Sequence, residues 1–117
     1  MTTTSNTPGK TTIALDVLVT IAKLTALSVD GVSRMATVPA DVNRLFKRGS
    51  SEGVKLSVDD DLVYADLFVI LKQGYNVREV SHKIQSNVSR AISEMVGMDV
   101  GKINIHVEDI NIENSDQ

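Results

Sequence analysis

The chain has 117 residues, and with 42% hydrophobic residues it can bury one core of modest size. It contains no cysteine, which excludes disulfides, thiolate metal sites and cysteine nucleophiles and suits a reducing cytoplasm. Its net charge of −3 argues against a general nucleic-acid-binding protein, because such proteins are usually basic. No apolar run reaches the roughly 20 residues that a membrane span needs, and the polar N-terminus has no apolar signal segment.

The first expected element is a helix over residues 14–28. Residues 1–12 before it are rich in threonine and serine, and we predict that they form a disordered tail. Within 14–28, apolar side chains recur at the spacing of one helix face. The predicted core-facing stripe consists of Val17, Ile21, Leu24 and Leu27, widened by Leu18 and Ala22. Asp30 and Gly31 are expected to end the helix.

A long connection follows over residues 37–53, and its centre has the pattern of a short helix. Three basic residues flank two apolar ones there: Arg44, Leu45, Phe46, Lys47 and Arg48. A cluster of this kind can bind anionic lipid or a protein partner, and a solvated face is the alternative for so short a charge cluster. We take these five residues as one candidate interaction surface.

A β-hairpin is predicted next. Residues 54–58 alternate between apolar and polar side chains, as is typical of a half-buried strand. The three aspartates at 59–61 are expected to form the turn, and residues 62–72 a second, longer strand. The odd-numbered residues of that strand are all apolar and are predicted to face the core: Val63, Ala65, Leu67, Val69 and Leu71.

The even-numbered side of the 62–72 strand is unusual, because it is also apolar. Its large residues are Leu62, Tyr64, Phe68 and Ile70, interrupted by Asp66. If both helices pack on the other face of the sheet, this side is left open. The first helix, the 37–53 connection or another subunit would then cover it. We expect a partner, because exposed apolar strips mark interaction surfaces, and we take the four apolar residues as a second candidate surface.

The helix over residues 76–96 has the clearest start signal in the chain. Asn76 fits as the N-cap, and Glu79 completes a capping box with it. Tyr75 and Val80 are placed to form the accompanying hydrophobic staple. The predicted apolar face consists of Val77, Val80, Ile84, Val88, Ala91, Ile92 and Met95.

No pattern of residues points to catalysis or to a cofactor. His82 lies about 200° around the helix from its apolar face, so we expect it to face solvent. His106 alternates with apolar residues in a third strand over 102–109, which places it on the outward face. Two outward histidines and three consecutive aspartates do not make a metal site. Nucleophile-elbow, P-loop and dinucleotide motifs do not occur in the sequence, so we expect neither enzyme activity nor a cofactor.

Together the elements predict an α+β domain over residues 13–110 in the order α-β-β-α-β. Its three-stranded, largely antiparallel or mixed sheet is expected to pack against two helices. We expect the first strand at the centre, so that the 76–96 helix joins non-adjacent strands through a right-handed crossover. Residues 111–117 are expected to form a C-terminal tail.

Several short segments occur in a recognisable order along the chain. They are Val17 with Ile21-Ala22, Gly31-Val32, Gly53-Val54, Gly74 with Asn76-Val77 and Glu79-Val80, Met95 with Gly97, and Ile103 to Val107. In this order and spacing the chain resembles the alkaline shock protein family, the envelope stress response proteins of Gram-positive bacteria. Two positions depart from the family pattern: Gln73 stands in place of a tyrosine, and Val96 in place of a threonine.

The resemblance implies a small, non-catalytic cytoplasmic protein that forms homo-oligomers. Some members of the family are held at the inner face of the cell membrane by a separate anchoring protein, which has its own membrane spans. The alternative is a KH-like RNA-binding module, which has a similar element order. Such a module grips RNA with a G-x-x-G loop, and here Gly49 and Gly53 are too far apart to form one. The acidic composition also makes a nucleic-acid partner the weaker interpretation.

Overall fold

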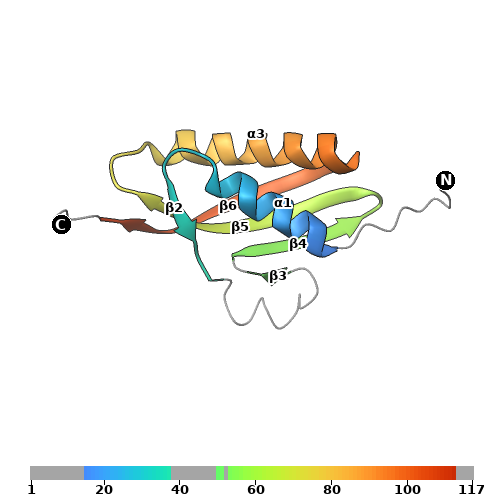
Figure 1. The fold of residues 1–117 in the computed structure, drawn as a ribbon, viewed down its shortest axis with the longest axis horizontal. Coiled ribbons are helices and arrows are strands. Elements are labelled where there is room, and N and C mark those ends of the chain that lie inside the picture. The colour runs from blue at the N-terminus through green and yellow to red at the C-terminus, as the bar shows by residue number, and fades with distance from the viewer. Residues whose placement is uncertain (1–14, 38–49, 52, 113–117) are drawn as a thin grey trace.

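The computed structural model describes residues 15–37, 50–51 and 53–112 (Figure 1). Its elements are helix α1 (Leu15–Leu27), strands β2 (Val32–Met35), β3 (Ser50–Ser51), β4 (Val54–Asp59) and β5 (Leu62–Lys72), helix α3 (Val77–Val96) and strand β6 (Asp99–Asn111). The predicted α+β class is confirmed, with both predicted helices and the three predicted strands present. The expected tail at 1–12, and all but the first two residues of the one at 111–117, lie outside the described residues.

The central strand of the sheet is β5. Its first half pairs antiparallel with β4, and part of its second half pairs antiparallel with β2. Along its other edge β5 pairs in parallel with β6, while β3 pairs with β4. The expectation that the first strand of the hairpin is central is therefore wrong. The reason is length: β5 has 11 residues and β4 has 6, so β4 occupies only part of one edge and leaves room for β2.

The crossover through α3 also differs from the expectation, because it joins two adjacent strands. The chain leaves β5, runs through α3 and returns as β6, which pairs with β5 along nearly its whole length. The strands β2 and β3 were not predicted from the sequence. They have four and two residues, which is too short for an alternating pattern to be recognised.

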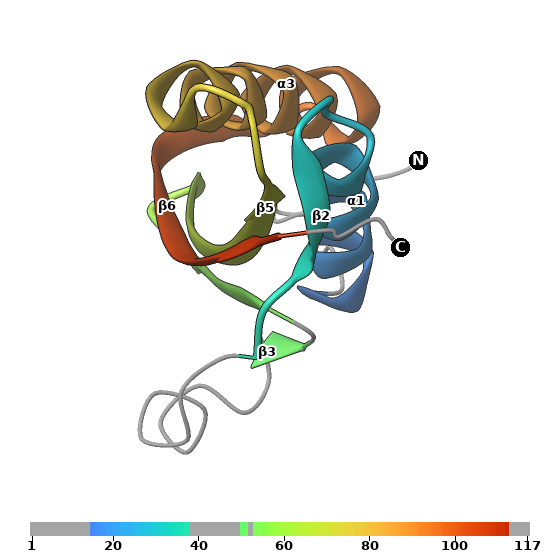
Figure 2. The same cartoon turned by 90° about the vertical axis from the view of Figure 1, so that its left-hand side faces the viewer.

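Both helices pack on the same face of the sheet (Figure 2). The odd-numbered residues of β5 are buried there, as predicted. They share one core with the buried residues of the two helices, which are Leu18, Val19, Ala22 and Ala26 in α1 and Val80, Ile84, Val88 and Ile92 in α3. The opposite side of the sheet, which we call the outer face, has no helix against it among the described elements.

The buried side of helix α1 overlaps only in part with the stripe that its sequence pattern predicted. Leu18 and Ala22, which widen that stripe, are buried, as predicted. In the expected stripe, Val17 is 47% and Leu24 is 58% exposed. The helix has apolar residues on both sides and only two charged residues, so hydrophobic periodicity does not distinguish the sides. The buried side contains Ala22 and Ala26, whose small side chains allow a close approach to neighbouring elements. Dense packing therefore selects that side.

The predicted N-cap is present at the start of α3, but the return bond of the capping box, from the N–H of Asn76 to the Glu79 side chain, is not found among the hydrogen bonds of the described residues. The Oδ1 atom of Asn76 accepts a hydrogen bond of 3.0 Å from the backbone N–H of Glu79. Tyr75 and Val80 both lie beside Gly31, in agreement with the expected staple. These contacts show that the polar and aromatic residues at 75–80 form a helix start.

The apolar face of α3 is shorter than predicted. Its middle residues are buried, but Val77 and Met95 are exposed, although the helical spacing puts them on the same side. They lie in the first and last turns, where the helix extends past the core. His82 is exposed, as predicted.

Candidate interaction surface

The outer face of the sheet carries the even-numbered side of β5. Tyr64 is 36% exposed there, and Leu62 and Ile70 are half-buried. Phe68 is only 6% exposed, because it packs with Ala36 and Ile70 in a small cluster separate from the main core. The core side of α1 packs on the other face of the sheet, so this helix does not cover the outer face. Three of the four apolar residues proposed from the sequence therefore reach solvent in the single chain.

A polar cluster lies in the middle of the outer face, and we call it the Asp66 cluster. It consists of Lys55 on β4, Asp66 on β5, and Asn104 and His106 on β6. One carboxylate oxygen of Asp66 lies 2.9 Å from the Nε2 atom of His106 and accepts a hydrogen bond of 3.1 Å from the amide of Asn104. The other oxygen lies 3.3 Å from the Nζ atom of Lys55. Both oxygens of the carboxylate therefore have partners within the chain.

The surroundings of Asp66 act in opposite directions on its pKa. Partial burial raises the pKa, because it disfavours the charged carboxylate. The hydrogen bonds from His106 and Asn104 and the positive charge of Lys55 lower it and outweigh the effect of burial. The pKa of Asp66 is thus below its ordinary value, and the carboxylate is charged at neutral pH.

An aromatic contact holds the histidine of this cluster. The rings of Phe68 and His106 are stacked, with 4.5 Å between their centroids and 11° between their planes. These residues are direct neighbours in the parallel pairing of β5 with β6. His106 lies on the outward face, as predicted, but its two partners were not foreseen. Asp66 is 40 residues away in sequence, and only the strand pairing brings the two side chains together.

Tyr64 packs on the backbone of β6. A Cβ atom placed on Gly101 would lie 2.7 Å from the Tyr64 ring, so the ring occupies the space above this glycine. The pairing of β5 with β6 is irregular here, with Gly101 as the extra residue between Val100 and Lys102. The missing side chain at 101 thus allows the tyrosine ring to lie against the strand.

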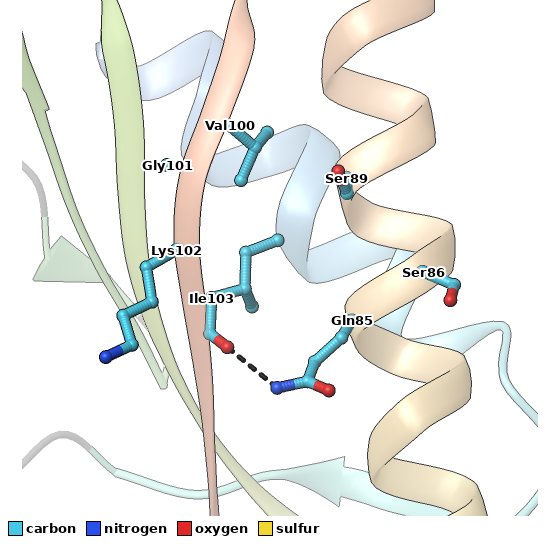
Figure 3. Close-up of a pocket in the computed structure, with 7 residues that line it drawn as sticks. All are labelled: Gln85, Ser86, Ser89, Val100, Gly101, Lys102 and Ile103. Carbon is cyan, nitrogen blue, oxygen red and sulfur yellow. Dashed lines mark hydrogen bonds between the residues drawn. The ribbon is translucent and has the colours of Figure 1, made fainter.

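A shallow groove of about 300 Å³ lies between α3 and β6 (Figure 3). Its lining consists of Gln85, Ser86, Ser89, Val100, Gly101, Lys102 and Ile103. The side-chain amide of Gln85 donates a hydrogen bond of 2.8 Å to the backbone oxygen of Ile103, while Lys102 points away from Gln85 (Figure 3). The groove therefore offers amide and hydroxyl groups but, among its lining residues, no paired acid and base.

The other candidate surface, Arg44 to Arg48, lies outside the described residues. Within the part of the chain that is described, no group of three or more histidine or acidic side chains is arranged to hold a metal ion. No described helix is long and apolar enough to cross a membrane. Among the described residues, the outer face is therefore the best-supported candidate for a binding surface, with the Asp66 cluster at its centre and apolar residues on either side.

Solved structures with a similar fold include MamM CTD. One such chain has a TM-score of 0.51 at 13% identity, and the match covers 81% of the present chain and 98% of that one. A variant of MamM gives a TM-score of 0.52 at 13% identity, covering 84% and 99%. At this identity the likeness concerns the fold alone.

Sequence relatives span most of the chain. The uncharacterized protein YqhY of Bacillus subtilis is 31% identical over 111 residues, which cover 93% of this chain and 82% of YqhY. The uncharacterized protein Spy1535 of Streptococcus pyogenes is 32% identical over 103 residues, which cover 87% and 79%. The model of the alkaline shock protein 23 family, described as having a cell envelope-related function, matches residues 3–112. The resemblance seen in the sequence is thereby confirmed, and the chain belongs to the alkaline shock protein 23 family.

Proposed function

We propose that this protein is a non-catalytic component of the envelope stress response, acting by self-association and by binding a partner such as a membrane-anchoring protein. The outer face of the sheet is its binding surface. In this proposal the protein works in the cytoplasm, at the inner face of the cell membrane when an anchor protein holds it. Membership of a family with a cell envelope-related function supports a role at the cell envelope. The accessible apolar residues and the paired Asp66 carboxylate of the outer face support action by protein–protein contact.

The observation that carries the proposal is the state of the Asp66 carboxylate. Burying a charged group at an interface is costly unless the group is already paired and hydrogen-bonded. The Asp66 carboxylate already has hydrogen-bond partners in His106 and Asn104 and an ion pair with Lys55, all within its own chain. A partner can therefore cover the outer face without supplying a matching charge, and the apolar side chains around the cluster can provide the contact.

Apolar side chains on either side of the cluster are accessible for such a contact. Tyr64 precedes Asp66 on β5 and Ile70 follows it, and both side chains are accessible to solvent. Covering apolar surface contributes about 25 cal/mol per Å². Only part of this gain becomes affinity, because association also costs translational and side-chain freedom. Phe68 contributes mainly to the monomer, since it is already buried.

The test is a double substitution on the outer face, Tyr64→Thr with Ile70→Thr. Threonine suits a β-strand, so the chain should stay folded while the apolar contact is lost. We expect a lower mass by sedimentation velocity at matched concentration and a nearly unchanged far-UV circular dichroism spectrum. Val58→Thr is the matched control. Val58 is also an exposed apolar strand residue, but it pairs directly with the core-facing Val63 and so lies on the opposite face of the sheet. A folded double variant that keeps the mass of the wild type would refute self-association through this face.

A further inference from the structure

Strand β6 forms one edge of the sheet. It pairs with β5 on one side, and none of the described strands pairs with its other side, which we call the free edge. The strand has 13 residues, a length of about 43 Å at roughly 3.3 Å per residue. It contains no proline, a residue that often blunts an exposed edge. An edge of this length is a template for another strand, because its backbone groups are available for pairing.

The backbone groups that reach the free edge belong to the core-facing residues of β6. On β5, Phe68 donates its N–H to the carbonyl of Gly53 and accepts from the N–H of Ala36, so its backbone groups point away from β6. Neighbouring residues of a strand direct these groups to alternate sides, so the odd-numbered residues of β5 point toward β6. In the parallel pair the core-facing residues of β6 then point to the free edge. They are Ile103, Ile105 and Val107. The bond from the Gln85 side chain to the Ile103 carbonyl agrees with this orientation (Figure 3).

The sequence of β6 is complementary to itself when two copies run antiparallel. The strand runs from Asp99 to Asn111, so Ile105 is its middle residue. A two-fold axis at Ile105 places Lys102 of each copy opposite Glu108 of the other. Both side chains are exposed, and within the described part of the chain neither forms an ion pair. Opposite charges on facing strands attract, so this register joins the two copies at two charged pairs.

The remaining residues also match in this register. Apolar residues meet apolar ones, with Val100 opposite Ile110 and Ile103 opposite Val107. The residues whose backbone groups reach the free edge lie opposite one another, so their N–H and C=O groups can exchange hydrogen bonds. The Ile103 carbonyl keeps an acceptor position beside its bond from Gln85, because a carbonyl oxygen has two lone pairs.

Other registers of the same orientation are less favourable. A pairing centred on Asn104 would place Asp99 opposite Asp109, and like charges on facing strands repel. A pairing centred on His106 would leave Lys102 opposite an isoleucine. The charges of β6 therefore favour one register.

We propose that the free edge of β6 pairs antiparallel with the free edge of a second copy of this chain, about a two-fold axis at Ile105. The contact is self-complementary, as a two-fold contact between identical surfaces requires, and it joins the two sheets into one. The groove between α3 and β6 leaves space beside the first half of the edge, and its apolar lining residues Val100 and Ile103 would lie next to the second half of the other strand (Figure 3). The proposal shares self-association with the proposed function but places it at a different surface.

Reversing the two charges tests the register. Lys102→Glu and Glu108→Lys should each weaken dimerisation about tenfold, because two attractive pairs become repulsive. The double variant Lys102→Glu with Glu108→Lys restores both pairs with their order reversed, and it should associate as the wild type does. Lys83→Glu is the matched control, since Lys83 is an exposed residue of α3, and it should leave association unchanged. Sedimentation velocity at several concentrations measures this, and circular dichroism checks folding. A folded double variant that associates no better than the single variants would overturn the proposal.

Hydrogen exchange of single amides, followed by NMR, tests the strand pairing itself. The N–H groups of Ile105 and Val107 reach the free edge, whereas those of Asn104 and His106 point toward β5. When about nine-tenths of the chains are paired, exchange at Ile105 and Val107 should be about tenfold slower than in the monomer, because exchange follows the unpaired fraction. Exchange at Asn104 and His106 should not change with concentration. Amides at 105 and 107 that exchange equally fast in monomer and dimer would overturn the proposal and leave the edge to a strand of a different protein.

The Tyr64→Thr, Ile70→Thr variant separates this proposal from the proposed function. If that variant keeps the wild-type mass, association through the outer face fails, while the amides of Ile105 and Val107 still report on the free edge. If the variant loses mass and these two amides exchange freely in the associated wild type, the proposal for β6 fails and the outer-face proposal stands.

Discussion

Replacing Asp66 with asparagine tests how much the Asp66 cluster stabilises the outer face. Asparagine has nearly the same size but no charge, so it loses the ion pair with Lys55 and weakens the hydrogen bonds from His106 and Asn104. The Asp66 side chain is 21% exposed, so solvent screens part of each interaction. Counting two charge-assisted hydrogen bonds and one screened ion pair, we expect the free energy of unfolding at pH 7 to fall by about 1–3 kcal/mol.

The size of this loss should depend on pH, because the pKa of Asp66 is lower in the folded chain than its ordinary value of 3.8. The folded state binds this proton less readily than the unfolded state. The stabilising contribution is therefore complete above the unfolded pKa and is lost as the pH falls through the folded pKa. The difference in stability between wild type and Asp66→Asn should shrink as the pH is lowered from about 5 to below 3.

Urea unfolding followed by circular dichroism, repeated at pH values from neutral to acidic, measures this difference. Asp99→Asn serves as the control, because Asp99 is an exposed carboxylate on β6. Because the side chain is exposed, its replacement should change the free energy of unfolding at pH 7 by less than about 0.5 kcal/mol. A gap for Asp66→Asn that stays constant into strong acid would refute the role given to the lowered pKa. An Asp66→Asn variant as stable as wild type at pH 7 would refute the stabilising role of the cluster.

Three further predictions concern stability and metal independence. Asn76→Ala removes the helix cap and should cost about 1 kcal/mol in urea unfolding, whereas His82→Ala should change stability by less than about 0.5 kcal/mol. Gly101→Ala places a Cβ against the Tyr64 ring and should destabilise the chain by about 1–3 kcal/mol. In a Tyr64→Thr background the cost should be clearly smaller, and equal costs would show that the ring is not the obstacle. Dialysis against a strong chelator should leave the thermal melting curve unchanged, and a loss of stability restored by one metal would contradict the expected metal independence.

The sequence by itself determined the two helices and the three longer strands of this protein, because their signals lie within a few residues of one another. The cap formed by Asn76 and Glu79 joins residues three apart, and the alternation in 62–72 assigns the odd-numbered residues to the core without knowledge of the neighbouring strands. The order of short motifs along the chain also identified the family, since this needs no spatial information. The outward position of His106 followed from alternation alone.

Only the tertiary structure decided which apolar side of α1 is buried and what surrounds His106. The two sides of α1 are similarly apolar, so the choice depends on how closely Ala22 and Ala26 approach other elements. Such packing depends on the shapes of residues distant in sequence. The contact of Asp66 with His106 likewise requires β5 and β6 to pair in one particular register over a separation of 40 residues. A strand pattern states which way a side chain points, but the pairing register decides which side chain it meets.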